Sequence, residues 1–161
     1  MRLGKKVLLI DLDPQCNFDY LWYERRAVTY DLGGRGSLLF DDYEKAWQSE
    51  ELVEKVLAAP RSIHFLLKAT EEGVNELENY PNPIKLYDNL DLIPGRLSIH
   101  QYENKIAERW SSVYQGDNLG IRTITNIRRI CEKYNQMNKY DYILVDTSPS
   151  LGVLNKVIIL Q

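Results

Sequence analysis

Three aspartates stand at places in the sequence where carboxylates could act together. Asp11 and Asp13 follow a short apolar run at residues 7–10, and Asp146 closes a second run at residues 142–145. Both runs are short and partly β-branched, which is typical of strands buried on both faces of a parallel sheet. Because the carboxyl ends of parallel strands meet at one edge of a sheet, we expect the three carboxylates to converge there.

Converging carboxylates of this kind predict a cation site. Asp11 and Asp13 lie on the same side of their strand by its period of two. Acids that repel one another in a partly dry site need a cation or a shared proton. Oxygen ligands suit Mg²⁺, which keeps several waters and commonly bridges to phosphate. A carboxylate near such an ion could also orient or deprotonate an attacking water.

The competing interpretation is that each aspartate only opens a turn or caps a helix. For any one of the three acids taken singly, this is the more frequent role. The segments that follow them, Pro14-Gln15 after the first strand and "TSPS" at 147–150 after the other, favour a shared site when all three are considered together.

The elements needed to position these acids alternate along the chain. The patterns predict strands at 7–10, 89–94 and 142–145, and helices at 38–59, 97–114 and 120–138; proline chemistry predicts a loop at 80–83. In the last helix the expected inward stripe is Ile121, Ile124, Ile127, Ile130 and Cys131. Alternation of strands with helices predicts an α/β fold, with a mainly parallel sheet flanked by helices.

Composition narrows the class of protein. The 161 residues fit one domain, and the 44% apolar and 27% charged residues are a globular composition. With a net charge of −3, the chain has no overall excess of basic residues that would indicate nucleic-acid binding. Cys16 and Cys131 are far apart, without metal-ligand spacing, which suits a reducing compartment. No apolar run approaches the ~20 residues of a membrane span, so we expect a cytoplasmic protein with no membrane partner.

Both ends of the chain are interpreted as cut. Gly4, Lys5 and Lys6 are typical of residues that follow a helix, and "LNKVIILQ" at 154–161 begins an apolar segment. We therefore expect residues 1–161 to form a single, incomplete domain that is truncated at both termini.

Two segments resemble nucleotide-site motifs of the ParA/MinD family of deviant Walker P-loop ATPases. They are "KKVLLIDLDPQCN" at 5–17 and "YDYILVDTSPSLGVLN" at 140–155, and "NLDLIPG" at 89–95 resembles a third family strand, usually "NLDLIPA". The matches occur in the family's order, whereas residues 18–88 match it only loosely. The resemblance implies a P-loop NTPase fold.

The resemblance also implies roles for individual residues. Asp13 would position or activate the hydrolytic water. Asp11 would support the metal site, and Asp146, the Walker B acid, would hold Mg²⁺ through water. The cofactor-binding positions that the resemblance implies are Asp11, Pro14, Gln15, Thr147 and Pro149. Thr147 and Pro149 belong to the switch segment at 147–151. Ser148 departs from the proline usual at that place.

For the intact family, the resemblance implies ATP and Mg²⁺ as cofactors and a role in plasmid, chromosome or cargo partitioning. ATP-dependent homodimerisation, nonspecific DNA binding, a ParB-like activator and association with the nucleoid are implied with it. The family's phosphate loop belongs upstream of Gly4, and "GGRG" at 33–36 lacks the lysine and hydroxyl pair needed to replace it. We therefore expect this chain to be inactive as an ATPase on its own.

Two other functions remain open. A non-catalytic ParA-like binding module would keep the fold, and its activity would survive loss of Asp13 or Asp146. A phosphoacceptor receiver also uses aspartates at strand ends, but it requires a lysine on a later strand, which is not evident after Asp146.

Overall fold

The computed structural model describes residues 4–15, 60–74, 77–149 and 152–160. The elements in chain order are β1 (Val7–Asp11), α5 (Ile63–Glu72), β2 (Ile84–Tyr87), β3 (Leu90–Ile93), α6 (Ile99–Arg109), η1 (Ser111–Gln115), α7 (Asn118–Asn138), β4 (Tyr142–Asp146) and α8 (Val153–Ile159). The three strands expected from the sequence are confirmed as β1, β3 and β4. The helix expected at 38–59 lies outside the described residues.

The sheet is mixed but mainly parallel, as predicted. Its strand order is β2-β3-β1-β4, with β1 parallel to both β3 and β4, and β2 antiparallel to β3. Because β1, β3 and β4 all run in one direction, their carboxyl ends share one edge of the sheet. The expected α/β fold with a mainly parallel sheet is confirmed.

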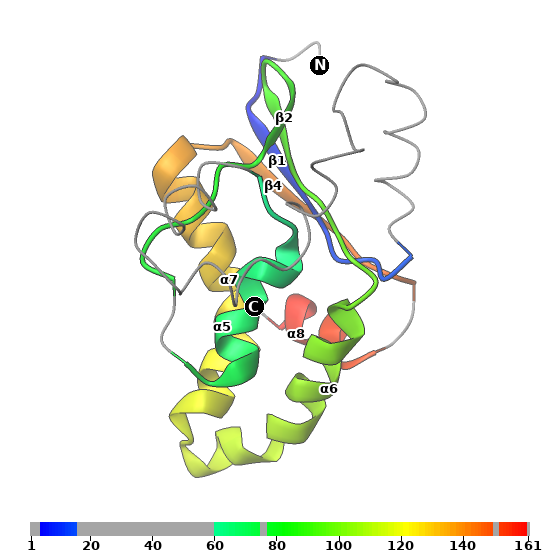
Figure 1. Cartoon of the computed structure of the whole chain (residues 1–161), viewed down its shortest axis with the longest axis vertical. Coiled ribbons are helices and arrows are strands. Elements are labelled where there is room, and N and C mark those ends of the chain that lie inside the picture. The colour runs from blue at the N-terminus through cyan, green and yellow to red at the C-terminus, as the bar shows by residue number, and fades with distance from the viewer. Residues whose placement is uncertain (1–3, 16–59, 75–76, 150–151, 161) are drawn as a thin grey trace, which may run out of the picture.

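The main core lies between the sheet and the helices α5, α6, α7 and α8, which lie together on one side of the sheet in Figure 1. Alternate residues of β1 supply its centre, since Leu8 and Ile10 are fully buried there. On the opposite face, Leu9 packs with Leu86 and Leu92 in a smaller apolar cluster. With apolar contacts on both faces, β1 takes the central position that its continuous apolar run predicts.

The longest helix, α7, confirms the helix expected at 120–138. It begins after Asp117, whose carboxylate accepts a 2.7 Å hydrogen bond from the backbone N–H of Gly120. The expected apolar stripe is wrong at one end, because Ile121 is 40% exposed. Thr123 and Asn126 are buried instead. These polar residues lie on the buried face, which a stripe drawn through isoleucines alone does not include.

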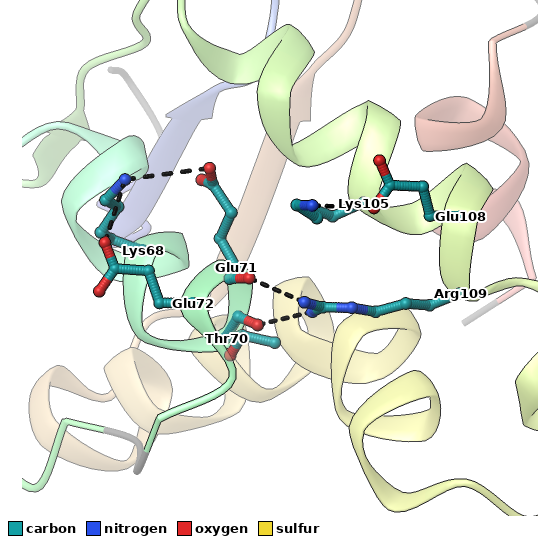
Figure 2. A network of polar contacts seen from close by, with 7 residues as sticks. All are labelled: Lys68, Thr70, Glu71, Glu72, Lys105, Glu108 and Arg109. Atoms are coloured by element: carbon teal, nitrogen blue, oxygen red, sulfur yellow. Dashed lines mark hydrogen bonds and ion pairs between the residues drawn. The ribbon is translucent and has the colours of Figure 1, made fainter.

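The helix expected at 97–114 is divided in two. α6 ends at Arg109 and the 3₁₀ helix η1 follows. The Arg109 guanidinium donates 2.8 Å hydrogen bonds to the backbone oxygens of Thr70 and Glu71 at the end of α5 (Figure 2). It also donates a 3.0 Å bond to Thr123 Oγ1 of α7. One side chain thus joins three helices and donates to two carbonyls in the last turn of α5.

Among the described helices, none combines the length and apolar character needed to cross a membrane.

Candidate functional site

The carboxyl ends of β1 and β4 bring two of the predicted acids side by side. Asp11 and Asp146 are direct partners in the parallel register. The ladder continues one residue further, since the Leu12 N–H donates a 2.8 Å hydrogen bond to the Asp146 backbone oxygen. Asp13 follows two residues after Asp11. The strand ends therefore gather the acids at the edge where open parallel sheets bind ligands.

Asp11 is the buried member of this group. Its side chain is fully buried; Oδ1 accepts a 2.9 Å hydrogen bond from the Asp13 N–H. Oδ2 is also buried and receives no hydrogen bond from the described residues. Burial raises the pKa of Asp11 to about 6. The hydrogen bond from Asp13 N–H opposes this, and the charges of Asp146 and Asp13 add to the rise. The carboxyl therefore has an unused oxygen and a reason to hold a proton or a cation.

Asp13 is 9% exposed and makes a turn of its own. Its Oδ1 accepts a 3.0 Å hydrogen bond from the N–H of Gln15. Two successive aspartates thus hold the loop after β1, as the turn-forming interpretation predicts. Each of these hydrogen bonds uses only one carboxylate oxygen, so turn formation and ligand binding are compatible. Pro14 is half-buried and Gln15 is exposed.

The segment after β4 is more open to solvent. Asp146 and Pro149 are exposed, and Thr147 and Ser148 are half-buried. The Asn155 side chain of α8 donates a 2.6 Å hydrogen bond to the backbone oxygen of Ser148. This contact ties the loop after β4 to the helix that follows it. Residues 150–151 of the predicted switch segment lie outside the described residues.

A third element borders the acids and was not anticipated from the sequence. The loop after β3 places Gly95 against Asp11. The backbone oxygen of Pro94 accepts a 2.9 Å hydrogen bond from Ile63, the first residue of α5. Arg61 and His64, beside that residue, are buried. From the sequence, Pro94 was interpreted only as the end of a strand. A Pro-Gly pair directly after a strand also indicates a tight loop.

The described side chains at this edge offer few direct ligands for a magnesium ion. Within the described ranges, no three His, Cys, Asp or Glu side chains are grouped so that they could hold a metal directly. A metal ion here would therefore take most of its ligands from outside these side chains. The pair Asp11 and Asp146, with the buried unpartnered Oδ2, fits an ion that keeps most of its waters and takes further ligands from phosphate.

Comparison with known proteins gives a match over the whole chain. A family model described as an AAA domain matches residues 1–161. The sporulation initiation inhibitor protein Soj of Bacillus subtilis is 28% identical over 152 residues, which are 94% of this chain and 41% of Soj. The chain thus spans less than half the length of this curated relative.

Solved structures match the same architecture. Protein DIP2308 from Corynebacterium diphtheriae has a TM-score of 0.68 at 25% identity, covering 98% of this chain and 46% of that one. A plasmid partition protein from Borrelia burgdorferi has a TM-score of 0.51 at 24% identity, covering 98% and 48%. Cobyrinic acid a,c-diamide synthase from Mycobacterium smegmatis, with a bound ATP analogue and magnesium, has a TM-score of 0.52 at 20% identity, covering 96% and 43%.

Proposed function

Because the chain belongs to the AAA domain family, as a ParA/MinD-like P-loop ATPase, we propose that its strand-end aspartates form the metal side of an Mg²⁺–ATP site. The observation that carries the proposal is the register pairing of Asp11 with Asp146 at the carboxyl edge, where Asp11 Oδ2 is buried and has no hydrogen bond from the described residues. A bound magnesium ion would supply positive charge for the phosphates.

In this proposal each acid has a separate task. Asp146, which is exposed, holds a water of the magnesium ion. Asp11, its buried register partner, would keep negative charge close to the ion, and it fixes the loop after β1. Asp13, held by the Gln15 N–H through one oxygen, orients the attacking water through the other. Pro14, Gln15, Thr147 and Pro149 line the nucleotide side of the two loops.

The activity of the whole protein follows the same proposal. It is an ATPase of plasmid, chromosome or cargo partitioning that forms an ATP-dependent homodimer, binds DNA nonspecifically and responds to a ParB-like activator. The support is the similarity to Soj and the shared fold of a plasmid partition protein. The chain covers 41% of Soj, so these steps draw on residues of the whole protein as well.

The test is Mg²⁺-dependent binding of an ATP analogue to this chain, followed by residue-resolved NMR. We expect resonances of residues 11–15 and 146–149 to shift only when magnesium and nucleotide are both present. Asp146→Ala should abolish these shifts. The matched control is Asp141→Ala, because Asp141 lies next to the opposite end of β4, where it pairs with Lys5 at 2.8 Å. Equal binding by both variants would contradict the proposal.

A second candidate is a non-catalytic ParA-like binding module. It is favoured by one observation: one carboxylate oxygen of Asp11 and one of Asp13 accept hydrogen bonds within the loop after β1. This candidate predicts that Asp13→Ala and Asp146→Ala leave partner binding unchanged and that magnesium has no effect on the chain.

A further inference from the structure

A side chain of α8 holds the loop after β4. Asn155 is the third residue of α8, and its Nδ2 donates a 2.6 Å hydrogen bond to the backbone oxygen of Ser148. This bond reaches back along the chain to a residue that lies two positions after Asp146. The loop that leaves the candidate site is therefore fastened to the helix that follows it.

The backbone at this point needs a donor from elsewhere. Residue 149 is a proline, so the peptide that joins Ser148 to Pro149 has a carbonyl oxygen and no N–H. Because Ser148 is half-buried, its carbonyl oxygen is partly shielded from water and requires a donor from the protein. The amide of Asn155 supplies that donor without adding charge beside the strand-end carboxylates.

The strand and the helix on either side of this loop are both anchored. Buried side chains place α8 in the main core, where it packs against α6 and α7. Alternate residues of β4 pack against the same core. Because helix and strand share this support, Asn155 holds Ser148 at a defined place relative to Asp146. Loss of the bond would give the loop more freedom to move between its two anchors.

We propose that Asn155 is a positioning residue for the loop after β4. Its hydrogen bond fixes the Ser148 carbonyl and thereby keeps Thr147 at the carboxyl edge, next to Asp146. The same bond connects α8 directly to the candidate site. The effect of Asn155 on a bound magnesium–nucleotide complex rests on the proposed function, whereas its effect on the loop does not.

The experiment is NMR of the isotopically labelled full chain without nucleotide or metal. In the wild type we expect a scalar coupling across the hydrogen bond, between the Asn155 side-chain nitrogen and the Ser148 carbonyl carbon. Asn155→Leu keeps a similar size but has no donor, so the heteronuclear NOE of the Thr147 and Ser148 amides should fall as the loop gains fast motion. The matched control is Asn104→Leu, at an exposed residue of α6, which should leave both amides unchanged.

A second variant, Asn155→Asp, separates loss of the donor from damage to the helix. A carboxylate near the beginning of a helix is favourable, but it cannot donate to the Ser148 oxygen. The Thr147 and Ser148 amides should therefore gain motion as in Asn155→Leu, while the amides of α8 keep their wild-type values. The proposal is overturned by an absent coupling in the wild type, by unchanged loop amides in both variants, or by equal gains of motion along α8.

Nucleotide binding is measured separately. With magnesium present, Asn155→Leu should bind an ATP analogue about two- to tenfold more weakly than wild type, as expected for the loss of one hydrogen bond. Asn104→Leu should bind like wild type. Equal affinities of Asn155→Leu and wild type would overturn the effect of Asn155 on the site. A wild-type chain that does not bind the analogue contradicts the proposed function, and the measurements without ligand then still decide whether Asn155 positions the loop.

Discussion

Asp11 and Asp146 are register partners on two adjacent parallel strands, yet the first is fully buried and the second is exposed. The pair therefore joins a desolvated carboxyl to one that reaches water. In the proposed metal site, the exposed Asp146 would contact the ion's waters and the buried Asp11 would supply negative charge beside it. Burial, before any other cause, raises the pKa of Asp11 to about 6.

The raised pKa predicts that Asp11 destabilises the fold at neutral pH. The rise from 3.8 to about 6 corresponds to about 3 kcal/mol. The folded state binds this proton more tightly than the unfolded state does. The stabilisation that protonated Asp11 gives the folded state is therefore fully present below pH 3.8 and is lost as the pH rises through about 6. Asp11→Asn, which keeps an acceptor for the Asp13 N–H, should raise the free energy of unfolding at pH 7.5 by about 1–3 kcal/mol.

Urea unfolding between pH 4 and pH 8 checks this prediction. The difference in free energy of unfolding between Asp11→Asn and wild type should grow with pH over this window and then level off. The control is Asp88→Asn, a change at an exposed acid in the turn between β2 and β3. A difference that does not depend on pH would show that Asp11 has an ordinary pKa in the folded chain.

Much of this edge could be predicted from the sequence. Short apolar runs that end in aspartate identified β1 and β4, and parallel pairing then required Asp11 and Asp146 to meet. The unequal burial of the two acids could not be predicted, because the loop after β3, which lies against Asp11 in the fold, is remote from it in the sequence. That packing leaves no periodic signal in the residues around Asp11.

The elements α5 and β2 were missed for physical reasons. Residues 63–67 of α5 are all buried, so the first half of the helix has no polar face to produce a helical period. β2 is only four residues long and pairs antiparallel with β3, with a break in register after Lys85. The position of so short a strand is set by its pairing with β3 more than by a hydrophobic pattern of its own.

The hydrogen bond between Tyr140 and Asp91 should stabilise the far end of the sheet. Tyr140 Oη donates to Asp91 Oδ2 at 2.6 Å, and both residues are buried. Burial, followed by the bond to Asp91, raises the pKa of Tyr140, so the phenol keeps its proton. Tyr140→Phe leaves the carboxylate without this donor and should cost about 1–3 kcal/mol in urea unfolding. Tyr114→Phe, at an 83% exposed side chain, should change stability little; equal effects would refute the assignment.

Arg109 should matter more to stability than other arginines on the same helices. Its guanidinium donates to two backbone carbonyls at the end of α5 (Figure 2). It also donates to Thr123 of α7. Arg109→Ala should lower the free energy of unfolding by about 1–3 kcal/mol, since the carbonyls lose charged donors. Arg128→Ala removes an exposed ion pair with Glu132 and should cost about 0–1 kcal/mol. Thermal melting of the two variants, measured side by side, shows whether Arg109→Ala costs more stability than Arg128→Ala.

The most direct test of the central claim uses Mn²⁺, an oxygen-seeking ion that can replace Mg²⁺ and broadens nearby resonances. Sub-stoichiometric Mn²⁺ is added with an ATP analogue to isotopically labelled chain, and the backbone amides are observed. The account predicts selective broadening at Asp11, Asp13, Asp146 and Thr147, lost in Asp146→Ala and kept in Asp141→Ala. Broadening elsewhere, or none at the ends of β1 and β4, would contradict a metal–nucleotide site at this edge of the sheet.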